Sequence, residues 1–110
     1  MRDGAARVEM PWAPGNADAR GQVHEGAVAA LLDTAGAMAS WSIVGLDFTY
    51  KASTVSIHAS FHASAAGETV VAHARTLRRA NESFLNTVTV SAGRRTIATG
   101  SVTYRIVVPG

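Results

Sequence analysis

The 110-residue sequence contains no cysteine, only three prolines and few aromatic residues. Without cysteine, a disulfide framework, a thiol nucleophile and a thiolate metal site are all excluded, and the composition fits a reducing compartment. No apolar stretch of roughly 7 to 15 residues follows the first residues, so we expect no signal peptide. The longest apolar run, residues 26–41, is shorter than the ~20 residues needed to cross a bilayer. These features predict a soluble, cytoplasmic protein without a membrane partner.

Charge is also sparse: 16% of the residues are charged and 47% are hydrophobic, with a net charge of +2. This balance is typical of a globular chain, and residues 1–110 are long enough for one domain, which buries roughly two thirds of its unfolded surface. The basic residues are scattered, with small clusters only at Arg78-Arg79 and Arg94-Arg95. With no basic helix or aromatic stacking platform, nucleic acid is not an expected partner.

Hydrophobic periodicity predicts one helix and several strands. Residues 25–41 are small or apolar on every face, which is typical of a buried helix. From Val55 the period changes to two, since Val55, Ile57, Ala59 and Phe61 alternate with polar residues and predict a strand with one dry face. Further strands are expected at residues 6–12, 69–79, 83–91 and 95–108, with a possible brief strand at 49–54.

The order of these elements predicts an α+β fold in which a curved antiparallel sheet wraps around one central helix. The short connections between the last four strands favour antiparallel neighbours, and a single apolar helix must pack against the sheet they form. Long strands leave an exposed edge, so we expect a homo-oligomer, a dimer at least, to cover it.

Asp33 is the residue that most needs an explanation. It is the one charge after Glu25 in the predicted helix, and its neighbours offer no charged partner. A carboxylate in an apolar helix is costly to bury, so it indicates either chemistry or an anchor held by buried hydrogen bonds.

The turn before the helix favours chemistry. Residues 21–26 (GQVHEG) place a polar, glycine-flanked turn at the helix N-terminus, where free N–H groups and the macrodipole can stabilise an oxyanion. Gly26 and Asp33 are seven residues apart and hence ~10 Å apart along the axis. One acyl carbon cannot contact both, so we expect Asp33 of one subunit to meet the helix N-terminus of the other in a two-fold dimer.

The run GQVHEGAVAALLDTAGAMA resembles the helix motif of the PaaI-like hot-dog-fold acyl-CoA thioesterases, G-x-x-H-G-G-x-x-x-x-L-x-D-x-A. KAST before a strand and the closing ATGSVTYRIV match the family's strand pattern, and the resemblance spans about residues 6–108. It implies the hot-dog fold, dimers joined through a continuous sheet, often tetramers, and hydrolysis of acyl- or aroyl-CoA with no metal or redox cofactor.

The resemblance also assigns catalytic roles by position. Asp33 matches the helix carboxylate, which acts as general base or nucleophile, and we favour the general base. Glu25 falls where the family has a Gly whose backbone N–H polarises the thioester carbonyl, and Gly26 is the second Gly. Thr54 falls near a Ser or Thr that orients the water or the carboxylate. His24 mainly shapes the turn and is a weaker catalytic candidate.

Two departures concern the substrate. Glu25 keeps the N–H donor but brings a bulky carboxylate into the site. Where the family has an Asn or Gln donor, this chain has Asp18, with Asn16 two residues earlier, and both are candidate substrate-binding residues. Three others, at a strand end where the family meets coenzyme A phosphates, are Arg78, Arg79 and Asn81, although a solvated charged turn is the plainer interpretation.

Two other functions remain open at this point. The same fold carries acyl-CoA hydratases and dehydratases, but His24 and Asp33 do not resemble their His–acid or His–Asn pairs. A non-catalytic acyl-CoA-binding module is favoured by Glu25 in place of Gly and disfavoured by Asp33 with Thr54. His58 and His62 have no third ligand in view, so no metal site is expected.

Overall fold

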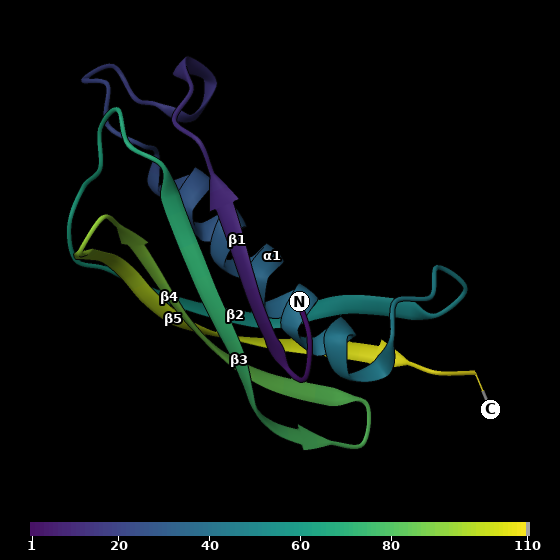
Figure 1. Ribbon diagram of the computed structural model, residues 1–110. Coiled ribbons are helices and arrows are strands. Elements are labelled where there is room, and N and C mark those ends of the chain that lie inside the picture. The colour runs from purple at the N-terminus through teal and green to yellow at the C-terminus, as the bar shows by residue number, and fades with distance from the viewer. Residues whose placement is uncertain (110) are drawn as a thin grey trace.

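The computed structural model describes residues 1–109, apart from the side chain of Asn16. In chain order the elements are β1 (Ala5–Met10), a 3-10 turn η1 (Pro14–Asn16), α1 (Glu25–Val44), β2 (Lys51–Phe61), β3 (Val70–Ala80), β4 (Ser83–Ala92) and β5 (Arg95–Val107). The strands form one antiparallel sheet in the order β1-β3-β4-β5-β2. Figure 1 shows this sheet curving around α1, which confirms the predicted hot-dog fold.

The core lies between one side of α1 and the three central strands. Leu32, Ala35 and Ala39 are fully buried there, against alternate residues of β4 such as Val88 and Val90. Because strand side chains alternate, the same strands turn residues such as Thr87 outward. Burial of the helix stripe and these strand residues holds α1 in the sheet's concave side.

Two glycines set how closely the elements approach. A Cβ on Gly36 of α1 would lie 2.7 Å from the Cβ of Val102 on β5, and a Cβ on Gly100 would collide with the carbonyl oxygen of His58. These contacts leave no room for a side chain. Gly36 and Gly100 therefore seat the helix on β5 and keep β5 in register with β2.

A buried polar group links the helix to the sheet. Asn86 is fully buried, and its amide nitrogen donates to Ser40 Oγ at 2.9 Å and to the Val102 carbonyl at 3.0 Å. Its Oδ1 accepts from the Thr76 hydroxyl at 2.7 Å. A satisfied buried network of this kind specifies one packing of α1 on β3, β4 and β5.

The helix is longer and less covered than its sequence predicts. It ends at Val44 rather than near Trp41, so its 20 residues are long and apolar enough to cross a membrane by length and composition alone. The prediction that the apolar segment is too short was therefore wrong. Core helices of soluble proteins pass the same test, and seven residues of α1 are buried against the sheet.

The prediction of a helix buried all round was also wrong, because Gly26, Ala30 and Thr34 are exposed in the single chain. The strand predicted from residue 55 begins at Lys51, so the possible brief strand is part of β2.

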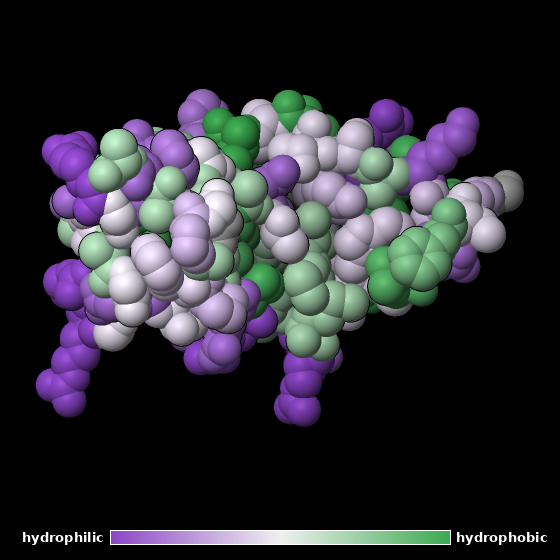
Figure 2. All heavy atoms as spheres, turned by 90° about the horizontal axis from the view of Figure 1, so that it is seen from above, coloured by the Kyte–Doolittle hydropathy of each residue, from purple (hydrophilic) through white to green (hydrophobic). Residues whose placement is uncertain are grey.

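β2 differs most from the prediction. Its apolar side chains were expected to form a dry face, but Val55, Ile57 and Phe61 are 58%, 41% and 39% exposed. β2 is an edge strand, paired with β5 along its whole length with one register shift between Thr54 and Ser56. Figure 2 shows further hydrophobic side chains at one end of the molecule, over the α1–β2 loop where Leu46 and Phe48 are exposed.

Candidate active site

Asp33 and Thr54 meet between α1 and β2. The Thr54 hydroxyl donates to Asp33 Oδ1 at 2.7 Å, and Asp33 is half-buried. Thr54 pairs with Tyr104 in the β2–β5 register, which turns its side chain toward the helix. The expected lack of a charged partner among the helix neighbours of Asp33 is compatible with this contact, because the partner is a hydroxyl on β2, at the position where a residue that orients the carboxylate was expected. Its second oxygen has no hydrogen bond within residues 1–109.

The helix N-terminus opens into a separate cavity. This cavity of about 390 Å³ is lined by Asp18, Arg20, Gln22, Val23, His24, Glu25, Gly26 and Ser64. His24 is the N-cap residue, and its side chain makes no capping hydrogen bond. The first amides of α1 have no acceptor within the helix, so their N–H groups are free for an anion or a polarised carbonyl.

The loop before the helix is fixed by Asp18. Its Oδ1 accepts hydrogen bonds from the backbone N–H groups of Arg20 at 2.8 Å and Gln22 at 3.1 Å. The hydrogen bond from the Arg20 amide, helped by that from Gln22 and by the charges of Arg20 and His24, lowers the pKa of Asp18. Asp18 thus closes the turn with one oxygen while its side chain lines the cavity.

Two lining residues were not singled out from the sequence. Arg20 and Ser64 reach the cavity because Val23 N–H donates to the Ala65 carbonyl at 2.8 Å, which ties the loop after β2 to the turn before α1. That contact joins positions more than forty residues apart, so local patterns give no signal of it. Gln22 belongs to the turn at residues 21–26, which the sequence marks as a candidate site. Its position two residues before His24 is the signal that could have identified it as a lining residue.

The cavity and the carboxylate are distinct within one chain. Neither Asp33 nor Thr54 lines the cavity, and α1 is continuous from Glu25 through Asp33. Regular helix geometry therefore keeps the Gly26 amide and Asp33 ~10 Å apart along the axis. A single subunit therefore does not bring the Asp33 carboxylate and the helix N-terminus together.

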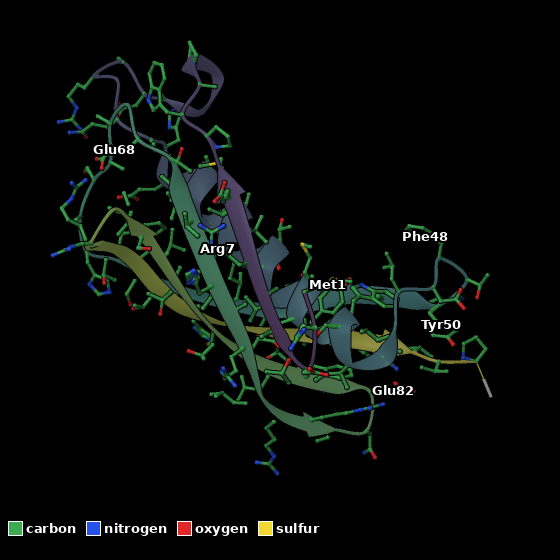
Figure 3. The ribbon with its side chains drawn as sticks, viewed as in Figure 1. Met1, Arg7, Phe48, Tyr50, Glu68 and Glu82 are labelled. Carbon is green, nitrogen blue, oxygen red and sulfur yellow. The ribbon has the colours of Figure 1, made fainter. Side chains whose placement is uncertain are left out.

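The predicted phosphate contacts lie at the other end of the sheet. β3 starts beside the cavity and carries Arg78 and Arg79 ~30 Å further along; Figure 3 labels Glu68 and Glu82 at these opposite ends. The Arg79 guanidinium lies 4.9 Å from the centre of the Phe84 ring, and its Nε donates to the Asn81 carbonyl at 3.4 Å. Arg78, Arg79 and Asn81 therefore lie far from this subunit's helix N-terminus.

Asn16 lies in the 3-10 turn η1, and its side chain is outside the described part of the structure. No group of three or more His, Asp or Glu residues within 1–109 is arranged to hold a metal ion. That no metal or other cofactor takes part stays a prediction.

The model of the thioesterase superfamily matches residues 20–99, which include the turn, α1 and the strands around it. The chain belongs to the thioesterase superfamily. No match is found among the curated proteins.

Solved structures of the superfamily have the same fold. A conserved protein of Pseudomonas aeruginosa is 26% identical with a TM-score of 0.88, covering 96% of this chain and 83% of its own. A thioesterase family protein of Silicibacter pomeroyi is 25% identical (TM-score 0.88; 99% and 82% covered). A mutant of the phenylacetic acid degradation protein PaaI of Thermus thermophilus is 25% identical (TM-score 0.80; 93% and 84%). Family and neighbours support a PaaI-like hot-dog protein and thioester hydrolysis as its general activity.

Proposed function

We propose that this protein hydrolyses acyl- or aroyl-coenzyme A thioesters to the free acid and coenzyme A, at sites shared by two subunits. The observation that carries the proposal is the hydrogen bond from Thr54 to Asp33 on an uncovered part of α1. It orients a carboxylate toward open space, which a purely structural anchor does not need. Residues 1–110 act as one domain in this proposal, located in the cytoplasm.

Asp33 acts as general base in this mechanism. Its carboxylate takes a proton from water as the water oxygen bonds to the thioester carbon, and the carbonyl oxygen becomes an oxyanion. The C–S bond then breaks, the carbonyl re-forms, and the Asp33 carboxyl returns the proton to the departing thiolate. If Asp33 is instead the nucleophile, the same carboxylate displaces the coenzyme A thiolate, which takes up a proton from water, and forms a mixed anhydride; water then cleaves this anhydride to the free acid and the regenerated carboxylate.

The helix N-terminus supplies the oxyanion hole. The backbone N–H groups of Glu25 and Gly26 point out of the first turn, where the macrodipole adds partial positive charge. The ~10 Å between Gly26 and Asp33 in one helix requires that these donors come from the partner subunit. Two antiparallel α1 helices related by a two-fold axis provide two such sites.

The exposed edge supports the dimer. β2 leaves Val55, Ile57 and Phe61 uncovered and its outer backbone groups unpaired within the chain, which is the kind of edge that a second sheet completes. The exposed Ala30 of α1 is small enough to let a second helix approach closely. A homodimer is therefore the minimal active form, and two dimers can associate further into a tetramer.

Substrate contacts are assigned more weakly. Asp18 and Asn16 lie in the loop before the cavity, and His24 shapes its turn. Arg78, Arg79 and Asn81 can contact the phosphates of coenzyme A only at a site completed by another subunit, because in their own chain they lie far from the cavity.

Free-thiol release from short-chain, long-chain and aromatic acyl-CoAs tests the proposal. Asp33→Asn keeps the shape of the side chain but removes the base, so turnover of the preferred substrate should fall by about 10²–10⁴-fold. Asp3→Asn is the matched control: it makes the same change at a turn residue whose side chain is 90% exposed, and turnover should stay at the wild-type level.

A second function is favoured by Glu25, whose carboxylate stands in the cavity where negative charge would develop. Binding of coenzyme A esters without thiol release from any of them would sink the hydrolase proposal and establish an acyl-CoA-binding module. Hydration of an enoyl-CoA, with no thiol release, would establish the hydratase instead.

A further inference from the structure

A second cavity lies on the opposite face of the sheet from α1. It has a volume of about 570 Å³ and is formed by the N-terminal residues with β1, β3 and β4. It shares no residue with the cavity at the helix N-terminus and includes neither Asp33 nor Thr54. Figure 3 labels Met1 and Arg7, two of its lining residues.

The strand register gathers its polar side chains in two rows. Arg7 of β1 lies opposite His73 of β3, which lies opposite Thr89 of β4. In the next row on the same face, Arg75 of β3 lies opposite Thr87 of β4. Since directly opposed residues point to the same face, guanidinium, imidazole and hydroxyl groups from three strands share one surface.

One arginine of this cavity has no carboxylate partner. Its lining contains three arginines and no carboxylate. Arg2 is paired with Asp3, and Arg7 is paired with Glu9, two residues further along β1, whereas Arg75 makes no ion pair within residues 1–109. Arg75 therefore offers a free guanidinium fork, the group that best fits a phosphate.

A tight turn at Arg2 to Ala5 holds the N-terminal residues at the edge of the cavity. Asp3 and Gly4 have φ angles of 53° and 79°, as a type I′ hairpin turn requires, and Arg2 exchanges two backbone hydrogen bonds of 2.9 Å with Ala5. Gly4 N–H donates to Ser42 Oγ at 2.8 Å, which ties the turn to α1. The hairpin thus brings Met1 and Arg2 to the cavity.

We propose that this cavity binds a phosphate-bearing anion. The Arg75 guanidinium donates to two phosphate oxygens, and the Thr87 and Thr89 hydroxyls donate to a third. Arg2 and Arg7 attract the anion over a longer range. The phosphate is either part of a coenzyme A molecule, in which case the site rests on the proposed function and extends its substrate contacts, or a free phosphate that binds independently.

Titration calorimetry at low salt with adenosine 3′,5′-bisphosphate and with inorganic phosphate tests the site. We expect the wild type to bind at least one probe and Arg75→Gln to weaken that binding by about tenfold or more, as loss of a charge-assisted contact does. Arg94→Gln removes the same charge from an exposed turn outside the cavity and should change binding less than about twofold, because Arg94 makes no contact with the bound phosphate.

The two probes separate the sources. Tighter binding of the bisphosphate, displaced by added coenzyme A, assigns the phosphate to that molecule, whereas equal or tighter binding of inorganic phosphate assigns a free phosphate. Asp33→Asn should bind either probe as the wild type does, so failure of hydrolysis leaves this test intact. No binding of either probe, or equal weakening by Arg75→Gln and Arg94→Gln, would overturn the proposal.

Discussion

The two sides of α1 are built for different purposes. On the covered side, Leu32, Ala35 and Ala39 are fully buried, and Gly36 touches Val102. On the open side, Ala30 and Thr34 are exposed and Asp33 is half-buried beside an edge strand. On the covered side, the fold is specified by side chains whose volumes fit the space between helix and sheet. The open side has small and polar residues that the packing of one chain does not need. The chemistry and the partner are therefore to be sought on the open side.

Next to Asp33→Asn, the largest effect at the proposed site should come from the loss of a backbone N–H group. Glu25→Pro removes the N–H group of Glu25, the proposed oxyanion donor. Proline is well tolerated at the first helical position, which Glu25 occupies. The preceding residue, His24, already has the extended conformation that a following proline favours, with ψ 137°. We expect kcat to fall by about 10²–10³-fold, which is typical for loss of one such donor. Glu25→Ala keeps the N–H group and is the matched control in the thiol-release assay.

A change on the covered side should affect stability instead. Gly36→Ala would gain helix propensity but forces a methyl group into Val102, so we expect a net loss of about 1–3 kcal/mol in the free energy of unfolding. Thr34→Ala, on the open side, should be neutral or slightly stabilising through propensity. Urea denaturation of both variants decides this: equal effects would mean that the two sides of α1 do not differ.

Much of this division is visible in the sequence, but one part is not. An all-round apolar segment with a single Asp predicts the helix and its carboxylate, and alternation predicts β2. Neither pattern says which neighbour covers a face: β2 was expected to have a dry face, yet residues 1–109 leave Val55, Ile57 and Phe61 partly exposed. Arg20 and Ser64 were missed for the same reason, since only the pairing of Val23 with Ala65 brings them together.

Removal of the Thr54 hydroxyl on the edge strand β2 should have an intermediate effect on kcat. Thr54→Val keeps the shape but removes the donor to Asp33 Oδ1, so the carboxylate loses its orientation and kcat should fall by about tenfold, the value of one hydrogen bond to a charged group. Ser53→Ala, whose side chain points to the other face of β2, should leave kcat unchanged. Equal activity of Thr54→Val and wild type would remove Thr54 from the site.

The smallest effect concerns the loop before the helix. The pKa of Asp18 is held below its usual value of 3.8 by the Arg20 and Gln22 amides. A lowered folded-state pKa gives stability that is present above the unfolded value and is lost as the pH falls through the folded one. Below about pH 4, the protection factors of the Arg20 and Gln22 amides, which are corrected for the intrinsic pH dependence of exchange, should therefore fall, and Asp18→Asn should abolish most of that fall. An unchanged exchange profile in the variant would contradict this.

Mixing two inactive variants tests the shared site most directly. Asp33→Asn and Glu25→Pro homodimers each lack one part at both sites. If Asp33 works with the N–H groups of the partner subunit, subunit exchange in an equal mixture creates heterodimers with one intact site each, and about one quarter of the wild-type activity returns. If both parts belong to one subunit, every site in every dimer stays defective and no activity returns, which would contradict the account.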